Sequence, residues 1–323
     1  MEHKFIVSSS PHIHISESIS DLMLDVVIAL LPATFMGVYY FGMRAALVIL
    51  TAIAASMVSE YLYQKLMKKP VTTKDLSAMV TGLLIGLNMP PLVPLWMVVV
   101  GSAFAIVIVK QLYGGLGKNF LNPALAARCF MLAAWAGAMT TTFTEPFMSA
   151  DVISQATPLA ILNGTSDSSA PSLVQTFLGV TSGSIGETSA MMLLIGGLYL
   201  LLKRVISIRI PFSYILTFAV LTFFFGDNAT MLSQTEFTLL HIFSGGLMLG
   251  ALFMATDYTT TPTTKKGQII FGIGCGLLTF VIRRFGGYPE GVSFSILLMN
   301  IVTPLIDRFT VPKKFGEVRR HAK

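Results

Sequence analysis

The chain has 323 residues, of which 54% are hydrophobic and only 12% are charged, and its formal net charge at pH 7 is +6. A soluble domain carries roughly 25% charged residues, so this chain has too few charges to cover a water-soluble surface. An excess of basic over acidic residues, here 22 to 16, can indicate a nucleic-acid partner when the basic residues cluster on one face. Their distribution along this chain instead indicates a protein of the lipid bilayer, with no nucleic-acid partner.

Ten apolar stretches recur along the chain, and each is expected to be helical because backbone amides in lipid have no water to bond. They cover residues 22–41, 45–63, 76–89, 92–109, 121–138, 189–202, 210–225, 237–255, 269–282 and 292–306. A full crossing needs about 20 residues, so the shorter stretches must use flanking polar residues or lie buried in the bundle. The pattern predicts an all-α integral membrane protein with about ten transmembrane helices.

The positions of Lys and Arg predict how these helices are oriented. With the N-terminus in the cytoplasm, eighteen of the 22 basic residues fall in cytoplasmic segments, three fall in outer loops, and Arg128 lies within a span. Cytoplasmic loops of membrane proteins carry an excess of Lys and Arg. We therefore expect both termini in the cytoplasm, with residues 1–21 as an N-terminal segment and residues 308–323 as a basic tail.

The longest break between apolar stretches, residues 139–187, contains no basic residue and is rich in Ser, Thr, Gly and Pro. It is predicted to be a long extracytoplasmic loop between two five-helix repeats, residues 22–138 and 188–307. Because each half has an odd number of spans, the second half is inverted relative to the first. Gly82 and Gly86 in the third stretch are echoed by Gly246 and Gly250 in the eighth, which favours an inverted-repeat fold; ordinary tight packing explains each pair singly.

The two cysteines, Cys129 and Cys275, both lie inside apolar stretches. Two isolated thiols cannot by themselves ligate an iron–sulfur cluster or a structural zinc ion. We interpret both as small buried hydrophobic residues and predict no metal site.

The outer loop contains the sequence Asp-Val-Ile-Ser-Gln-Ala-Thr-Pro-Leu at residues 151–159. Thr157 precedes a proline, which favours an extended backbone, and a hydroxyl that is modified by a transferase needs such an accessible segment. Asp151 and Ser154 are also common turn-forming residues. The spacing alone therefore leaves a modification site and a simple turn as alternatives.

This stretch resembles the flavinylation motif of the NqrB/RnfD family, whose members are membrane subunits of Nqr and Rnf electron-transport complexes, and the resemblance is to the RnfD branch. Asp151, Ser154, Ala156 and Thr157 match the motif, and Gln155 stands where many such motifs have glycine. The resemblance extends over nearly the whole chain. Its other landmarks are residues 81–84 with 90–91, residues 110–117 with Asn119, Asn122, Pro123 and Ala124, residues 247–251, residues 285–292, and Asn300 with residues 304–307.

The resemblance implies a membrane subunit of an ion-translocating ferredoxin:NAD oxidoreductase, with FMN joined to Thr157 through its phosphate and electron flow coupled to Na+ or H+ transport. It also implies a multi-pass location in a bacterial or archaeal cell membrane. The implied partners are a flavin transferase for maturation and the other Rnf subunits, including further membrane subunits and a second covalent flavoprotein subunit. A Gly-x-Gly-x-x-Gly dinucleotide motif is absent, so no catalytic residue is assigned and NAD chemistry is expected in another subunit.

A second, non-covalent riboflavin is a further expectation from the related NqrB proteins. Asn119 and Asn122 lie among glycines and aromatic residues on the predicted cytoplasmic side, and asparagine side chains can bond the edges of a flavin ring. Asn122 before Pro123 also fits the start of a helix. Both interpretations stay open at the level of the sequence.

Charged residues within spans are candidates for an ion path or for neutralising a bound flavin. Arg128 and Asp25 are the clearest, and a structural ion pair is the alternative for each. His241 begins an apolar run and is expected at the membrane interface rather than in redox chemistry. For the whole chain, the alternatives are a urea-channel-like transporter and a cofactor-free scaffold subunit.

Overall fold

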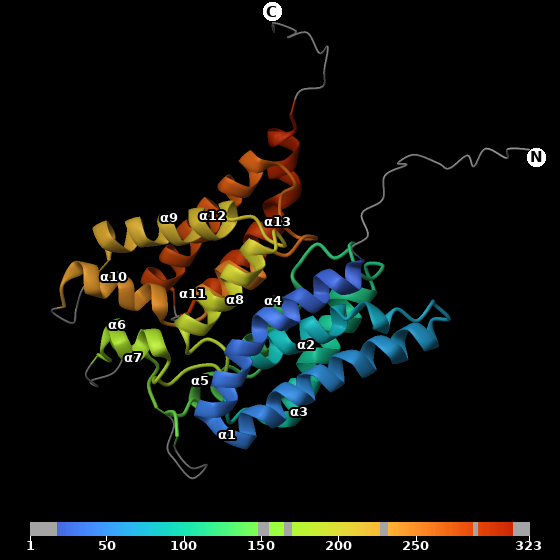
Figure 1. The fold of residues 1–323 in the computed structure, drawn as a ribbon, viewed down its shortest axis with the longest axis horizontal. Helices are drawn as coiled ribbons and strands as arrows, with labels where there is room; N and C mark the ends of the chain where they lie inside the picture. The colour runs from blue at the N-terminus through green and yellow to red at the C-terminus, as the bar shows by residue number, and fades with distance from the viewer. Residues whose placement is uncertain (1–17, 148–154, 165–169, 227–231, 287–289, 313–323) are drawn as a thin grey trace, which may run out of the picture.

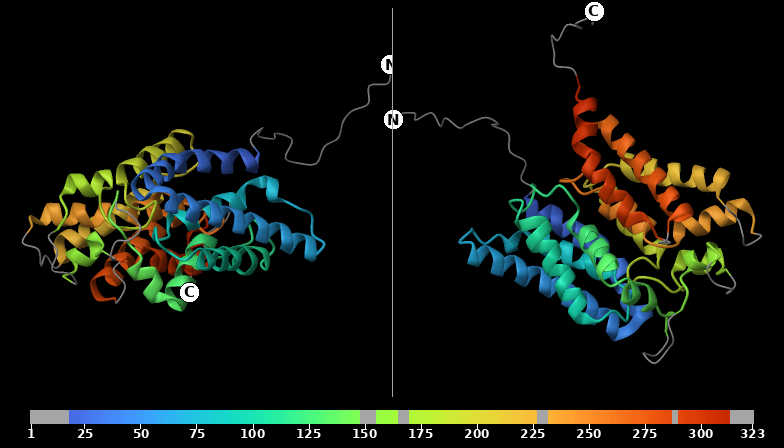
Figure 2. Two further views of the ribbon diagram at one scale, coloured as in Figure 1. Left: turned by 90° about the horizontal axis from the view of Figure 1, so that it is seen from below. Right: turned by 180° about the vertical axis from the view of Figure 1, so that it is seen from behind.

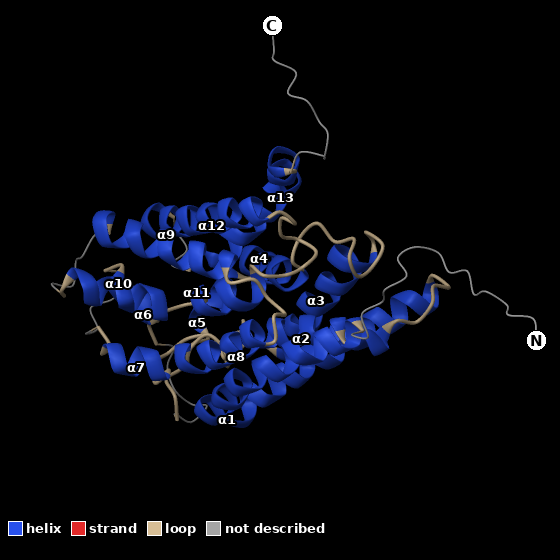
Figure 3. Ribbon diagram, turned by 45° about the horizontal axis from the view of Figure 1, so that its top comes forward, coloured by secondary structure: helices blue, strands red, loops and turns tan. Residues whose placement is uncertain are grey.

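The computed structural model describes residues 18–147, 155–164, 170–226, 232–286 and 290–312. Within these ranges every regular element is a helix and none is a strand (Figure 3). The all-α prediction is therefore confirmed for the part of the chain that is described. The motif residues Asp151 and Ser154 lie outside it.

The first helix, α1 (Ile19–Leu66), joins the first two predicted spans in a single element of 48 residues. It begins at Ser18, whose side chain accepts a hydrogen bond from the backbone N–H of Asp21 while the Asp21 carboxylate accepts one from the N–H of Ser18. Gly42 interrupts the helix with a φ of 69°, a conformation open to glycine because it lacks a Cβ. The sequence predicted two helices here, and the structure places the bend between them at this glycine.

Shorter helices complete the first half of the chain. They are η1 (Thr73–Asp75), α2 (Ser77–Leu87), α3 (Leu95–Ala103), the π-helix η2 (Phe104–Gln111), α4 (Pro123–Ala134) and α5 (Ala136–Thr141). Gly82 lets α2 lie directly against α1, because a Cβ there would come within 2.7 Å of the Ala52 carbonyl oxygen. The small residues of the third predicted span thus serve close helix packing.

Among its described residues, the stretch predicted as a long outer loop contains the end of α5 and two short helices, α6 (Pro158–Leu162) and α7 (Leu173–Leu178). Its last part has no helix but is buried: Ile185 is fully buried and its N–H donates to the Met89 carbonyl at 3.0 Å. The next N–H, from Gly186, donates to the Leu87 carbonyl at 2.8 Å. This segment therefore covers the C-terminal end of α2 rather than lying free over the surface.

The described residues of the second half form six α-helices and one further π-helix. They are α8 (Ala190–Leu202), α9 (Arg209–Phe225), α10 (Gln234–Phe243), α11 (Leu247–Leu249), the π-helix η3 (Gly250–Met254), α12 (Lys265–Phe285) and α13 (Val292–Thr310). In Figure 1, α9, α10, α12 and α13 form one group of helices and α1 to α5 form another, with α8 between them; Figure 2 shows the same two groups from behind.

Three helices of the described residues are long and apolar enough to span a membrane: α1, α12 and α13. A fourth span results if α10 and the α11–η3 segment, which meet at a 63° bend, are taken together. Five shorter apolar helices accompany them, at Ser77–Leu87, Leu95–Gln111, Pro123–Ala134, Ala190–Leu202 and Arg209–Phe225. The chain is therefore a multi-pass membrane protein, while ten spans and an inverted repeat stay predictions.

Broken helices from the two halves meet in the middle of the molecule. Asn88 ends α2, and its side-chain amide lies 3.7 Å from the sulfur of Met254, which ends η3. The side chain of Asn122, at the start of α4, donates to the Met254 carbonyl at 3.2 Å. The orphan carbonyl at the end of η3 is thus satisfied by a residue of the other half.

Candidate functional site

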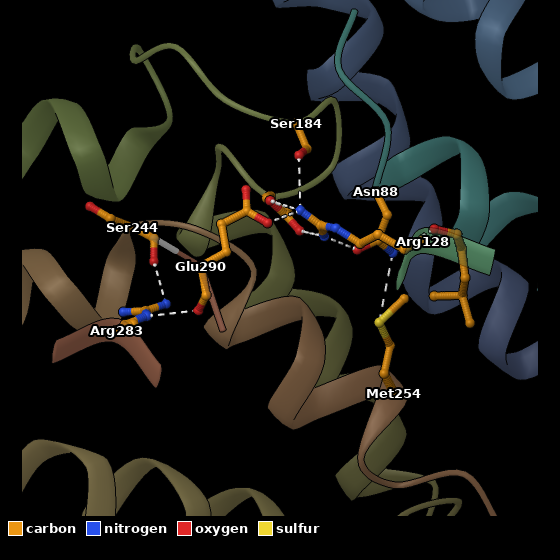
Figure 4. A network of polar contacts seen from close by, with 9 residues as sticks. Asn88, Arg128, Ser184, Ser244, Met254, Arg283 and Glu290 are labelled. Carbon is orange, nitrogen blue, oxygen red and sulfur yellow. Dashed lines mark hydrogen bonds and ion pairs between the residues drawn. The ribbon is translucent and has the colours of Figure 1, made fainter. Parts of the chain in front are cut away.

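Arg128 lies at the centre of a buried polar network that joins the two halves (Figure 4). It projects from α4, which begins with Asn122 as its cap and Pro123 in its first turn, and it is only 4% exposed. Its guanidinium forms ion pairs with Glu187, just before α8, and with Glu290, just before α13. It also donates to Asn88 at the end of α2. The structural ion pair, which was the alternative to a functional charge at Arg128, is thus present in the structure.

The charges of this network do not cancel, because one guanidinium faces two carboxyl groups. Desolvation raises the pKa of Glu290 to about 7, although the nearby Arg128 opposes that rise. Buried charges are tolerated when they are paired and hydrogen-bonded. Arg128 consequently has the structural role of pairing with both carboxyl groups. Its Nε has no hydrogen-bond partner among the described residues.

A cavity of about 730 Å³ opens beside this network, and we call it the Thr157 cavity. Its polar lining includes Arg128 and Glu290 from the network, Thr157 from the motif, and His241 and Arg283 from the second half. Its apolar lining is rich in aromatic rings, from Phe143, Phe218, Phe237, Phe280 and Phe294. The structure therefore places the motif threonine and Arg128, 29 positions apart in the sequence, around one space.

Thr157 lines this cavity and is the N-cap of α6. Its backbone is extended, with φ −73° and ψ 154°, as expected for a residue before proline. Its hydroxyl accepts a hydrogen bond from the N–H of Ala160 at 3.3 Å, so it is also a helix cap. The preceding carbonyl, of Ala156, accepts from the hydroxyl of Ser182 at 2.6 Å. The backbone at the end of the motif is therefore held by a hydrogen bond, while the Thr157 side chain is partly exposed.

Arg283 is a second buried cation of the Thr157 cavity, and its hydrogen bonds end on backbone carbonyls. It lies in the last turn of α12 and is 5% exposed. It donates to the carbonyls of His241 at 2.6 Å, Ser244 at 3.3 Å and Glu290 at 3.0 Å. In the described part of the chain, no carboxylate oxygen lies within 4.0 Å of it. Arg283 therefore satisfies the C-terminal carbonyls of α10. Its positive charge is not neutralised by an ion pair within the described part of the chain.

His241 is buried within the protein, in α10, and the expectation that it lies at the membrane interface stays a prediction. It is 4% exposed, and its ring lies edge-on against Phe237 at 4.5 Å between centroids. Neither ring nitrogen has a hydrogen-bond partner among the described residues. Sequence reasoning missed it because one histidine in an apolar run carries no sign of the cavity that it faces.

Asn119 and Asn122 line a separate space of about 90 Å³, which we call the Asn119 cavity. The side-chain oxygen of Asn122 accepts from the N–H groups of Ala124 at 3.0 Å and Leu125 at 3.3 Å, so Asn122 is the helix cap that the sequence allowed. The side chain of Asn119 donates to the Leu121 carbonyl at 3.0 Å. Both amides are thus bonded to the backbone.

Asp25 lies apart from Arg128, between α1 and α8. It accepts a hydrogen bond from the Tyr199 hydroxyl at 2.6 Å and lies 3.7 Å from the ammonium group of Lys203. It lines neither the Thr157 cavity nor the Asn119 cavity. The two charged residues that the sequence singled out therefore do not form one site.

Comparison with known proteins gives a consistent family. The model of the NQR2, RnfD, RnfE family matches residues 6–316. The chain is 50% identical over 326 aligned residues to the D subunit of the Na(+)-translocating ferredoxin:NAD(+) oxidoreductase complex of Acetobacterium woodii, covering 100% of this chain and 99% of the relative. It is 47% identical to the D subunit of the proton-translocating ferredoxin:NAD(+) oxidoreductase complex of Clostridium ljungdahlii, covering 98% and 97%. It is 40% identical to the D subunit of the ion-translocating oxidoreductase complex of Stutzerimonas stutzeri, covering 95% and 94%. The chain belongs to the NQR2, RnfD, RnfE family.

Proposed function

We propose that this chain is a membrane subunit of an ion-translocating ferredoxin:NAD oxidoreductase complex and that it relays electrons through FMN bound covalently to Thr157. The relatives named above support the complex and its coupling to Na+ or H+. The observation that carries the flavin assignment is the position of Thr157, which lines a large cavity with an aromatic and cationic lining.

The cavity fits a flavin in size and in chemistry. Its volume of about 730 Å³ lies within the range of about 300–1,000 Å³ typical of small-molecule sites. Aromatic walls suit the flat isoalloxazine ring, and the guanidinium groups of Arg128 and Arg283 suit the negative charge of a phosphodiester. A bound flavin would supply the redox chemistry, while the residues of this chain attach it, shield it from water and set its electrostatic surroundings.

The proposal includes ten spans in two inverted repeats, with both termini in the cytoplasm and the Thr157 loop outside. The distribution of basic residues supports this orientation. The meeting of two broken helices, at Asn88 and Met254, supports the repeat, because such paired discontinuities mark the centre of inverted-repeat folds. On this basis the partners are the other Rnf subunits and, during maturation, a flavin transferase.

A second flavin, riboflavin near Asn119 and Asn122, stays part of the proposal as a separate element. The Asn119 cavity, at about 90 Å³, is smaller than the lower end of the range of about 300 Å³ for ligand sites. Binding of riboflavin there therefore requires side chains to move, and occupancy is testable by extracting non-covalent flavin from the purified complex.

The covalent flavin is tested on a denaturing gel of the complex purified from its native host, viewed under ultraviolet light. We expect a fluorescent band at the position of this subunit and its loss in Thr157→Ala. The matched control is Thr142→Ala, which removes a hydroxyl from the same predicted loop that bonds only the Ala138 carbonyl; its band should persist.

The other outcomes separate the competing functions. A wild-type subunit without the band contradicts the flavin carrier and favours a scaffold subunit. A band that survives Thr157→Ala moves the attachment to another residue. Solute uptake by the isolated subunit in liposomes would favour a urea-channel-like transporter.

A further inference from the structure

Unsatisfied polar atoms are concentrated around the Thr157 cavity. Among the described residues, eight buried side-chain nitrogen or oxygen atoms have no hydrogen-bond partner. Four of them, the Nε of Arg128, the Oγ1 of Thr222 and both ring nitrogens of His241, belong to residues that line this cavity. Leaving a buried donor or acceptor unpaired costs about 1–3 kcal/mol. Such atoms grouped around one space point to a ligand that bonds them.

His241 is best placed among these residues to contact a ring system. The backbone carbonyl of His241 accepts a hydrogen bond from Arg283 at 2.6 Å. Neither nitrogen of its imidazole has a hydrogen-bond partner among the described residues. The ring of Phe237 packs against the His241 imidazole, and His241 also lines the Thr157 cavity. A neutral imidazole offers one donor and one acceptor, which matches the alternating donors and acceptors along the edge of a flavin ring.

Arg283 places a fixed positive charge next to His241. Its three hydrogen bonds end on neutral carbonyls, and its guanidinium lies 4.9 Å above the ring of Phe218. Since no described carboxylate lies within ion-pair distance, its charge is available to a ligand in the cavity. Preorganised charge in a water-excluded site favours the ligand state that carries more negative charge.

We propose that His241 hydrogen-bonds the isoalloxazine ring of the flavin on Thr157 and that Arg283 is the neighbouring charge that raises its reduction potential. This rests on the proposed attachment of FMN to Thr157. The flavin gains negative charge when one-electron carriers of the complex reduce it, and Arg283 stabilises that form. No bond to either residue forms or breaks.

The test is a redox titration of the purified complex, followed by the visible spectrum of the covalent flavin. That signal is obtained by subtracting the spectrum of the Thr157→Ala complex. Arg283→Gln should shift the equilibrium at least tenfold toward the oxidised flavin, which is about 30 mV for a two-electron couple. Arg283→Lys keeps the charge and should recover part of the shift. Arg44→Gln, which removes an exposed charge that does not line the cavity, should leave the potential unchanged.

His241→Phe keeps the test decisive if Arg283 variants do not assemble, because Arg283 also caps α10. Phenylalanine preserves the ring packed on Phe237 and removes two nitrogens that have no protein partner among the described residues. The subunit should fold with undiminished thermal stability, and its flavin should remain covalent but change in absorption maximum and potential. An unchanged spectrum and potential in His241→Phe overturns the contact.

Failure of this inference is distinguishable from failure of the proposed function. If wild type and His241→Phe both show the fluorescent band and titrate identically, the flavin is present but His241 does not touch it. If the wild-type subunit shows no band, the attachment itself is wrong. An Arg283→Gln complex that assembles and keeps the wild-type potential removes Arg283 from the proposal.

Discussion

Arg128 of α4 and Glu290, which precedes α13, form an ion pair across 162 positions of sequence, in which Arg128 is buried and the Glu290 side chain is 22% exposed. Together with Glu187, 59 positions from Arg128, this pair joins α4 of the first half to the end of the predicted outer loop and to the residue just before α13 in the second half. Removing one charge of such an ion pair leaves its partner as an unpaired charge in the interior. The network should therefore contribute strongly to the stability of the protein.

Arg128→Met should destabilise the protein by about 3–5 kcal/mol, because it leaves the buried Glu187 and the partly buried Glu290 without their cation. Thermal unfolding of the purified subunit in detergent measures the loss. Lys118→Met, which removes an exposed cation, is the control and should change little. Equal melting temperatures for the two variants would show that the network contributes nothing to stability.

The stability of the protein should also depend on pH through Glu290. Its folded-state pKa, raised to about 7 by desolvation from the usual 4.5, means that the folded protein binds more protons than the unfolded chain between these values. The contribution of Glu290 is therefore fully present below about pH 4.5 and is lost as the pH rises through about 7. The melting temperature of Glu290→Gln, relative to wild type, should increase from pH 5 to pH 8. A difference independent of pH would contradict this.

Thr157→Ser separates the chemistry of the hydroxyl from the fold. Serine keeps both the nucleophilic oxygen and a good helix cap for α6, so the fluorescent band should persist. Thr157→Ala should lose the band and about 1 kcal/mol of local stability from the lost cap. Limited proteolysis near α6 measures the second effect, and equal proteolysis of the two variants would show that the cap is dispensable.

Close packing of α2 on α1 predicts a strong effect of a single methyl group at Gly82. Gly82→Ala would place a Cβ 2.7 Å from both the Ala52 carbonyl oxygen and the Ile53 Cα, so the helices must separate, at a cost of about 1–3 kcal/mol. Gly137→Ala in α5 meets nothing within 4 Å and should be neutral or slightly stabilising. Thermal unfolding of both variants makes the comparison, and similar melting temperatures would refute the packing argument.

Labelling of introduced cysteines tests the orientation. In a background with Cys129→Ala, Glu145→Cys should react with a membrane-impermeant maleimide on intact cells, because residue 145 is exposed in the predicted outer loop. Lys118→Cys, also exposed, should react only after the membrane is permeabilised. The reverse pattern would invert the topology.

The sequence predicted those features that depend on neighbouring residues. Continuous apolar stretches predicted helices, and Pro158 predicted the extended backbone of Thr157. Asn122 before Pro123 allowed a helix start, which the structure contains. Each of these depends on contacts within a few residues, and such contacts leave a local trace in the sequence.

Features that depend on distant contacts were not predictable in the same way. Arg128 stood out as a charge within a span, but its partners Glu187 and Glu290 lie beside helix starts far along the chain. The burial of His241 has no local sign in the sequence, because it depends on packing against distant elements such as α12, whose Arg283 donates to the His241 carbonyl. The break of α1 at Gly42 was expected only as a boundary between two helices, since its angle depends on how the flanking helices pack.

The polar network around Arg128 also limits which motions the protein can undergo. Rocking one half against the other, as in alternating-access carriers, would have to separate Arg128 from Glu290. Separating opposite charges within a low-dielectric interior is costly, and each 1.4 kcal/mol of that cost lowers the population of the separated state tenfold. A rigid frame of this kind would keep the proposed flavin at a constant distance from its redox partners, and tunnelling depends steeply on that distance.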